Sequence, residues 1–254
     1  MTPPETPAVQ VRDLGVVFPD GNGGLQALNG VDFTIYPQEF VTVLGPSGSG
    51  KTTLLRVLAG LISPTSGSVT FSVPGDASHR PHVGLVFQQA NLMPWRTLLE
   101  NVALPLQLQG VEKESAQVKA QELIDLVGLH GFEHNWPHDL SGGMAQRVAI
   151  ARSLVQDPDL LLLDEPFGSL DALTREKMGS ELLRIWQARC KTVLLVTHSI
   201  SEALFLSDRV LVLTPRPGRV CLDMKVDLAR PRQEDIRYTP HFGELARALR
   251  EAIS

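Results

Sequence analysis

Apolar and polar positions along the chain alternate in ways that predict strands, helices and loops. Almost wholly apolar runs predict buried strands at 40–44, 83–87, 160–163 and 192–197, and two final strands are expected at 209–213 and 219–226. Alternation over Val9–Phe18 and 31–35 predicts half-buried strands instead. The glycine-rich stretch 20–24 and the polar stretch 74–82 are expected to be loops. Buried strands that alternate with helical stretches are typical of the α/β fold class.

Helical periodicity fills the middle of the chain. From Asn91 to about Gln156 the strand pattern is missing, and apolar residues at helical spacing predict helices at 99–109, 113–127 and 144–155. Further helices are expected at 52–59, 172–188 and 243–252. The middle stretch therefore predicts a helical insertion between two halves of the sheet. The last helix is amphipathic, and we expect it to pack on its own domain.

One loop carries a specific chemical motif. The spacing Gly-x-x-x-x-Gly-Lys-Thr, between an apolar strand and a helix, is that of the phosphate-binding loop of nucleotide triphosphatases. Its glycines let successive N–H groups point at one anion, Lys51 is expected to reach the β- and γ-phosphates, and the Thr52 hydroxyl to hold Mg²⁺. The motif comprises Gly45, Pro46, Ser47, Gly48, Ser49, Gly50, Lys51, Thr52 and Thr53. An ordinary Gly/Ser-rich turn does not account for the lysine, the threonine and both flanking elements.

A second anion site is expected at the start of a later helix. Ser141 precedes the paired glycines Gly142 and Gly143, and we expect it to cap the helix that begins near Met144. The helix dipole and the small glycines leave this end open to a phosphate group. One chain therefore carries two candidate anion sites.

Polar side chains follow two of the predicted buried strands. In parallel sheets, residues that handle ligands gather at the carboxyl ends of the strands. Gln88 follows one strand and is expected to reach a metal or a water near the γ-phosphate, whereas its neighbour Gln89 is the weaker candidate. His198 follows another strand and is a candidate sensor of the γ-phosphate, although a lone histidine is more often structural.

Consecutive carboxylates end the leucine-rich strand at 160–163. Asp164 and Glu165 are unfavourable beside buried leucines unless they meet a cation or a polarised water. Asp164 is expected to support the Mg²⁺ held by Thr52, and Glu165 to orient or deprotonate the attacking water. Two exposed acids at the start of a loop are the alternative.

Composition and charge narrow the class of protein. The chain has 254 residues, a formal net charge of −5 and no lysine- or arginine-rich block, which argues against sequence-independent binding of nucleic acid. No apolar run approaches the roughly 20 residues that span a bilayer, and the proline-rich start lacks a signal-peptide pattern. Two cysteines are too few for a disulfide framework. We expect a protein of the reducing cytosol that meets a membrane only through a partner.

Two apolar features leave alternatives open. Phe18 ends a strand, where it either stacks on an adenine ring or lies in the core or at the sheet edge. The segment from Asn91 to Thr97 combines apolar and aromatic residues with an arginine. It is either a docking surface or a segment in which Met93 and Trp95 cover the core of the helical insertion.

The three histidines His130, His134 and His138 are spaced four residues apart. That spacing on one helix is compatible with a metal site. However, Gly131 and Pro137 argue against a continuous helix there, and solvated loop histidines are the expected interpretation.

Together these motifs resemble those of the ATP-binding subunit of ABC transporters over nearly the whole chain. The segment from Gly45 to Thr53 is similar to the Walker A motif and 160–165 to Walker B. Residues 140–147 are similar to the family signature, with Met144 where glutamine is common. The resemblance implies a P-loop (RecA-like) α/β core with a mixed sheet, an antiparallel β region and an inserted α-helical subdomain.

The resemblance also implies roles for single residues. Phe18 corresponds to the adenine-stacking aromatic, Gln88 to the Q-loop glutamine, Asp171 to the D-loop aspartate and His198 to the switch histidine. The implied magnesium ligands are Thr52, Gln88 and Asp164, and the implied catalytic groups are Glu165, His198 and Gln88.

An ATPase that works as a head-to-tail homodimer is the implied assembly. Each ATP lies between one Walker A and the partner's signature, so that Ser141 contacts the γ-phosphate bound by the other subunit. Transmembrane permease subunits dock near the segment from Asn91 to Thr97, and a periplasmic or extracellular substrate-binding protein takes part indirectly. The implied location is peripheral, on the cytoplasmic face of the cell (inner) membrane, with no nucleic-acid partner.

Finer resemblance connects the chain with importers of the nitrate, taurine and aliphatic-sulfonate type. The residues that carry it are 92–97, 213–219 and 227–232. Related subunits with similar motifs serve thiamine-precursor or riboflavin-type cargo. Because the ATPase does not bind the cargo, its residues do not name the solute.

The expected organisation is a flexible start at 1–8 and one ABC ATPase domain at 9–254. Within that domain, 9–88 and 157–226 form the core, 89–156 the helical signature subdomain and 227–254 a C-terminal extension. One alternative is a soluble ABC-type ATPase not coupled to transport, but the coiled-coil arms, zinc modules or fused cassettes usual there are missing from the sequence. The other is a P-loop small-molecule kinase, which has no need of the Leu-Ser-Gly-Gly motif.

Overall fold

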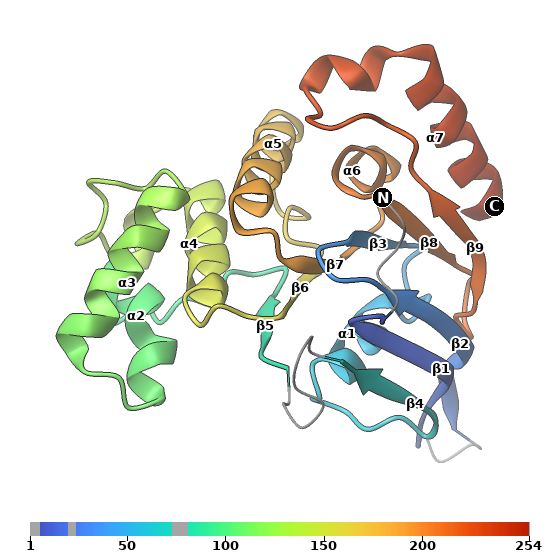
Figure 1. Cartoon of the computed structure of the whole chain (residues 1–254), viewed down its shortest axis with the longest axis horizontal. Helices are drawn as coiled ribbons and strands as arrows, with labels where there is room; N and C mark the ends of the chain where they lie inside the picture. The colour runs from blue at the N-terminus through green and yellow to red at the C-terminus, as the bar shows by residue number, and fades with distance from the viewer. Residues whose placement is uncertain (1–5, 20–23, 73–80, 254) are drawn as a thin grey trace. The chain divides into compact units, whose positions relative to one another are not determined.

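The computed structural model describes residues 6–19, 24–72 and 81–253 (Figure 1). The flexible start expected at 1–8 and the loops expected at 20–24 and 74–82 lie wholly or partly outside these residues. The chain divides into two compact units: unit 1 comprises residues 1–81 and 191–254, and unit 2 comprises residues 82–190. The expected boundaries of the helical subdomain, 89 and 156, stay a prediction.

An antiparallel sheet forms the first part of unit 1. It contains β1 (Val9–Phe18), β2 (Leu25–Ile35) and β4 (Ser66–Phe71) in the order β2-β1-β4. The strand β2 begins well before the expected 31–35. Its neighbouring residues Ala27 and Leu28 are both buried and the pairing with β1 shifts register, so the alternation is interrupted there.

Parallel strands form the second sheet region of unit 1. The strand β3 (Phe40–Leu44) lies between β7 (Thr192–Thr197) and β8 (Arg209–Leu213) and is parallel to both, while β9 (Val220–Lys225) is antiparallel to β8. Every residue of β3 and β7 is buried. This explains why continuous apolar runs predicted these strands, since strands covered on both faces have no polar side.

Unit 1 also contains α1 (Lys51–Leu58), α6 (Ile200–Leu206), the short 3₁₀ helix η2 (Glu234–Tyr238) and α7 (Pro240–Ile253). Figure 1 shows α7, in red, beside α6. Phe242 and Leu249 of α7 belong to one core cluster with residues of α6 and β8, so the expectation that the last helix packs on its own domain is confirmed. The helix α6 was not predicted, because five of its seven residues are buried and no amphipathic period is visible.

Unit 2 combines a parallel strand pair with helices. The strands are β5 (Val83–Val86) and β6 (Leu160–Asp164). The helices are α2 (Leu98–Leu108), α3 (Lys113–Leu126), the 3₁₀ helix η1 (Pro137–Asp139), α4 (Gly142–Leu154) and α5 (Ala172–Arg189). Figure 1 shows α2, α3 and α4 packed together, as expected for a helical insertion.

Both cysteines, Cys190 and Cys221, are free and exposed. Within the described residues, the helices are all too short or too polar to traverse a lipid bilayer. Together the two units contain the α/β core, the antiparallel region and the helical part that the motifs implied.

Candidate nucleotide-binding site

The phosphate loop of unit 1 joins β3 to α1. Gly48 and Gly50 have φ angles of 78° and 92°, in the left-handed region that favours glycine. Lys51 is buried, and its Nζ donates to the carbonyl oxygens of Gly45 at 2.9 Å and Pro46 at 3.0 Å. The ammonium group therefore lies against the loop, where its positive charge can attract an anion.

Three features of this loop fit the phosphates of a nucleotide. The helix α1 has Gly50 as its N-cap, and no side chain of the described residues caps it. The N-terminal N–H groups and the helix dipole are therefore arranged for an anion rather than for a side chain. A side chain at Gly50 would meet the Ala27 carbonyl at 2.8 Å, which makes the bare backbone necessary. Finally, the Ser49 Oγ is buried and has no hydrogen-bond partner within the described residues.

Thr52 and Thr53 occupy the first turn of α1 and are partly buried. Pro46 is partly buried, and Ser47 is exposed beside it. The hydroxyl of Thr52 is a hard oxygen donor of the kind that Mg²⁺ prefers, so its chemistry fits the expected metal role.

His198 lies directly after β7, and a buried hydrogen-bond network fixes its neighbours. The Thr197 Oγ1 donates to the Glu202 carboxylate at 2.6 Å and accepts from the Ser199 N–H at 3.0 Å. The Ser199 side chain in turn caps α6 by accepting from the Glu202 N–H. His198 is exposed between these two anchored residues, so its backbone is held while its ring faces solvent.

Phe18 is the last residue of β1 and is 38% exposed. This excludes a core position and leaves the ring at the end of the sheet. The exposed ring is available for stacking, which is the assigned role.

In unit 2, Gln88 and Glu165 approach the same glycine. A Cβ atom added to Gly168 would lie 3.0 Å from the Gln88 Nε2 and 3.6 Å from a Glu165 carboxylate oxygen. Asp164 ends β6, and Glu165 has a φ of 42°, an unusual conformation for a residue other than glycine. Strained backbone of this kind persists only where the surrounding contacts hold it, and it is common at functional sites.

The expected cap of α4 is confirmed. The Ser141 Oγ accepts from the Met144 N–H at 3.3 Å. Gly142 and Gly143 form the first turn, and added Cβ atoms there would meet Leu170 and Thr174 at 3.3 Å. The two glycines therefore allow the start of α4 to pack closely.

Asp171 is the N-cap of α5, where its carboxylate accepts from Thr174 N–H at 3.0 Å. The side chain and backbone of Thr174 hold the pKa of this carboxyl below its ordinary value. The lowered pKa keeps Asp171 ionised at neutral pH, and its exposure leaves the carboxylate accessible.

Three side chains of α4 that sequence reasoning missed fix the segment around Gln88. Gln146 donates to the Phe87 carbonyl at 3.1 Å, Ser153 to Leu85 at 2.9 Å, and Arg152 to the carbonyls of Ala90 and Asn91 at 2.7 and 2.9 Å. Burial lowers the pKa of Arg152. The helix α4, which Ser141 caps, thus holds both flanks of Gln88, a link that local sequence patterns do not reveal.

The segment from Asn91 to Thr97 is held by Asn101, another residue that the sequence did not single out. Asn101 is fully buried on α2, and its amide exchanges hydrogen bonds with the backbone of Met93, Arg96 and Thr97 at 2.8 to 3.2 Å. Trp95 is 69% exposed. It does not cover the core of the helical insertion, which was the alternative to docking.

A shallow groove of about 490 Å³ lies beside this segment. It is lined by Phe87, Asn91, Met93, Leu104, Pro105, Leu108, Gln109, Arg152 and Gln156. Phe87 and Leu108 are exposed. The groove is therefore mainly apolar, and its polar lining residues are Asn91, Gln109, Arg152 and Gln156.

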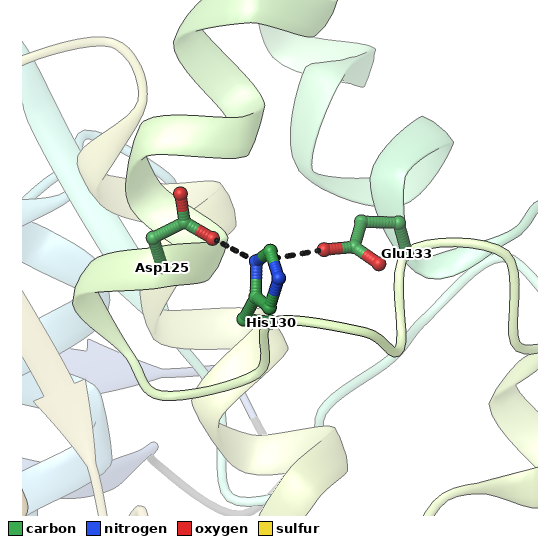
Figure 2. Close-up of side chains that lie close together, drawn as sticks. All are labelled: Asp125, His130 and Glu133. Carbon is green, nitrogen blue, oxygen red and sulfur yellow. Dashed lines mark hydrogen bonds and ion pairs between the residues drawn. The ribbon is translucent and has the colours of Figure 1, made fainter.

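His130 lies in a cluster with two carboxylates rather than with His134 and His138. Figure 2 shows its ring between Asp125 and Glu133; the His130 Nδ1 lies 3.2 Å from the Asp125 Oδ1 and 3.7 Å from the Glu133 Oε1. These same oxygens accept from the Gln121 amide, at 3.0 and 2.8 Å, and the Glu133 Oε1 also accepts from Gly131 N–H. The cluster closes the end of α3 through hydrogen bonds, and a metal ion would have to displace them.

The fold and the phosphate loop define the class of this protein: it is a P-loop nucleotide triphosphatase. A family model described as "ABC transporter" matches residues 28–168. The chain therefore belongs to the ABC transporter family, and it is an ATPase of that family.

Curated relatives agree with this assignment. The taurine import ATP-binding protein TauB of Rhizobium johnstonii is 46% identical over 236 residues, covering 90% of this chain and 89% of that protein. An ABC transporter ATP-binding protein of Methanocaldococcus jannaschii is 47% identical over 249 residues, covering 96% and 92%. These relatives confirm the resemblance to importer ATPases of the taurine type.

Solved structures give the same fold. A dimeric ATP-binding cassette, MJ0796, in a post-hydrolysis state with ADP and phosphate is 35% identical, with a TM-score of 0.73 over 87% of this chain and all of that chain. The cbiO1 protein of Clostridium perfringens, part of the ABC transporter complex cbiONQ, is 27% identical, with a TM-score of 0.77 over 96% of this chain and all of that chain. The predicted fold class is confirmed.

Proposed function

We propose that this chain binds and hydrolyses ATP as the energy-coupling subunit of an ABC importer for a small solute of the nitrate, sulfonate or taurine type. The observation that carries the proposal is the phosphate loop, with Lys51 buried across it and the N-terminus of α1 left without a side-chain cap among the described residues. The sequence identity with taurine import proteins supports import, rather than export, and a small solute of this kind.

In this proposal each site residue has a defined task. The N–H groups and Lys51 of the phosphate loop bind the triphosphate, and Phe18 stacks on the adenine. Thr52, Gln88 and Asp164 are the oxygen donors for Mg²⁺, which neutralises phosphate charge when bound. Glu165 orients and deprotonates the attacking water, and His198 and Gln88 sense the γ-phosphate.

The two anion sites of one chain serve two nucleotides in a head-to-tail homodimer. Ser141, Gly142 and Gly143 contact the γ-phosphate held by the partner subunit, and Asp171 lies near that interface. The dimeric state of the related cassette MJ0796 supports this arrangement. A twofold axis gives both nucleotides the same environment.

The permease subunits dock on the groove and on the segment from Asn91 to Thr97. The exposed Trp95 side chain offers apolar area, and the hydrogen bonds of Asn101 keep the neighbouring backbone rigid. Protein interfaces favour both properties. Arg152 connects the same surface to α4, so movement of the signature helix reaches the docked partner. The subunit then works peripherally at the cytoplasmic face of the membrane, with the substrate-binding protein outside.

One experiment on the purified chain tests the ATPase assignment. Glu165→Gln should bind ATP normally, lower turnover by about a hundredfold or more and form a dimer with Mg-ATP. Lys51→Ala is the matched contrast and should weaken binding itself. Nucleotide titration, phosphate release and size-exclusion chromatography measure the three quantities.

Full turnover by Glu165→Gln would remove that residue from its role. A strictly monomeric Mg-ATP complex would argue against the shared nucleotide. Transfer of phosphate to a small-molecule acceptor, in place of release, would favour the kinase alternative.

A further inference from the structure

The loop between β8 and β9 packs against the phosphate loop at three points. A Cβ atom added to Gly45 would lie 3.0 Å from the Leu213 carbonyl oxygen. The Arg216 Nε donates to the Gly48 carbonyl at 3.3 Å. An added Cβ atom on Gly218 would overlap the carbonyl oxygen of Ser49. Leu213, Arg216 and Gly218 belong to the 213–219 motif, and the proposed function assigns no role to this motif.

This β8–β9 loop, residues 213–219, is itself rigidly held. The Thr214 Oγ1 donates to the Pro217 carbonyl and accepts from the Arg219 N–H, both at 3.1 Å. The Gly218 N–H donates to the Ala27 carbonyl at 2.9 Å, and the Gly218 carbonyl accepts from Asn29 N–H at 3.1 Å. The β8–β9 loop is therefore fastened both across its own turn and to β2.

We propose that the β8–β9 loop positions the phosphate loop for nucleotide binding, with Arg216 and Gly218 as its positioning residues. The inference rests on the proposed function, since it concerns the affinity of the same ATP site. Neither residue is assigned a contact with the nucleotide or a part in the chemical step.

The physical reason is preorganisation. A loop that contains Gly45, Gly48 and Gly50 has many accessible conformations, and ordering each residue costs conformational entropy that opposes binding. Contacts that order the loop before ATP arrives reduce this loss of entropy on binding.

Arg216→Ala is the first test. Because Arg216 is exposed, its replacement should change the melting temperature of the nucleotide-free chain little. It should weaken ATP and ADP binding about five- to tenfold and raise KM, with kcat within about twofold, since loss of preorganisation acts on binding. The weakening should persist in high salt, where a purely electrostatic attraction by Arg216 is screened.

Arg219→Gln is the matched control. It removes the same charge from the same loop. Among the described residues, the contacts of this loop with the phosphate loop come from Leu213, Arg216 and Gly218, so Arg219→Gln should leave them in place. Gly218→Ala is the second variant and should weaken nucleotide binding more strongly, about tenfold or more, by displacing Ser49. Gly243→Ala on α7 is its control, since an added Cβ atom there has no neighbour within 4 Å.

Binding by Arg216→Ala within twofold of the wild-type chain, or an equal effect of Arg219→Gln, would overturn the inference. An effect of Arg216→Ala that disappears in high salt would replace positioning by charge attraction and also overturn it. If the wild-type chain fails to bind ATP, the proposed function itself fails, so the two failures are distinguishable.

Discussion

At the scale of single residues, hydrogen bonding lowers the pKa of a carboxylate far from the nucleotide loop in sequence. The Gln121 amide and the Gly131 N–H donate to Glu133 and lower its pKa to about 2. The folded pKa lies below the ordinary value of 4.5, so this carboxylate stabilises the fold above about pH 4.5. That stability is lost as the pH falls toward 2.

Glu133→Gln should therefore lower the melting temperature at pH 6, and the gap to the wild-type chain should close between about pH 4.5 and 2. Thermal unfolding followed by circular dichroism across this range measures the gap. Glu114→Gln, at an exposed position on α3, is the control. A gap that stays constant down to pH 2 would contradict the assigned pKa.

At the scale of elements, one buried amide organises the proposed docking surface. Asn101 on α2 is fully buried, and its side chain satisfies carbonyl groups of Met93, Arg96 and Thr97. Thr97 and Glu100 also form a capping box at the start of α2. The surface is therefore a rigid extension of the helix.

Asn101→Leu should affect the stability of the fold, and Trp95→Ala should affect the coupling of ATP hydrolysis to transport. Asn101→Leu leaves buried polar groups unpaired and should lower the free energy of unfolding by about 2–4 kcal/mol. Trp95→Ala should change it by less than about 0.5 kcal/mol and leave the ATPase of the isolated chain intact, yet reduce transport by the assembled importer.

Chemical denaturation, ATPase assays and uptake into proteoliposomes with the permease and substrate-binding partners measure these effects. Val118→Ala, which removes an exposed apolar side chain from α3, is the control for Trp95→Ala. Equal loss of ATPase and transport in Trp95→Ala would argue against a docking role. The same assembled importer identifies the cargo, as the solute that stimulates hydrolysis.

At the scale of the whole molecule, the C-terminal segment is joined to the core of unit 1. Arg232 is buried and donates to the carbonyls of Leu204, Phe205 and Ser207 at the end of α6 at 2.7 to 3.1 Å. Burial, and then the like charge of Arg230, lowers the pKa of Arg232 to about 10, so the guanidinium stays charged at neutral pH. A cation at the negative end of a helix is favourable.

Arg232→Ala should lower the free energy of unfolding by about 2–4 kcal/mol, because several buried carbonyls lose their donor. Arg232→Lys should restore little, since an ammonium group lacks the planar fork of donors. Urea unfolding measures both, with the exposed Arg247→Ala as control. Wild-type stability in Arg232→Ala would show that the hydrogen bonds of Arg232 do not contribute to the stability of the fold.

The sequence by itself determined the class of protein and most of its elements. Continuous apolar runs located the buried strands, and the spacing of Gly45, Gly50 and Lys51 located the phosphate loop, because these signals depend on neighbours in sequence. Ser141 was recognised as a helix cap for the same reason. The role of Glu165 stays a prediction that the Glu165→Gln variant tests, and the roles of Gln88 and His198 stay predictions.

Only the tertiary structure decided which distant residues support these motifs. Arg216 contacts Gly48 across 168 positions, and Arg152 holds Asn91 across 61. Such pairs have no local pattern, because they arise where separate elements meet. The short helix α6 and the bulged start of β2 escaped prediction for a related reason: burial on all sides and shifted register remove the periodicity that marks a helix or a strand.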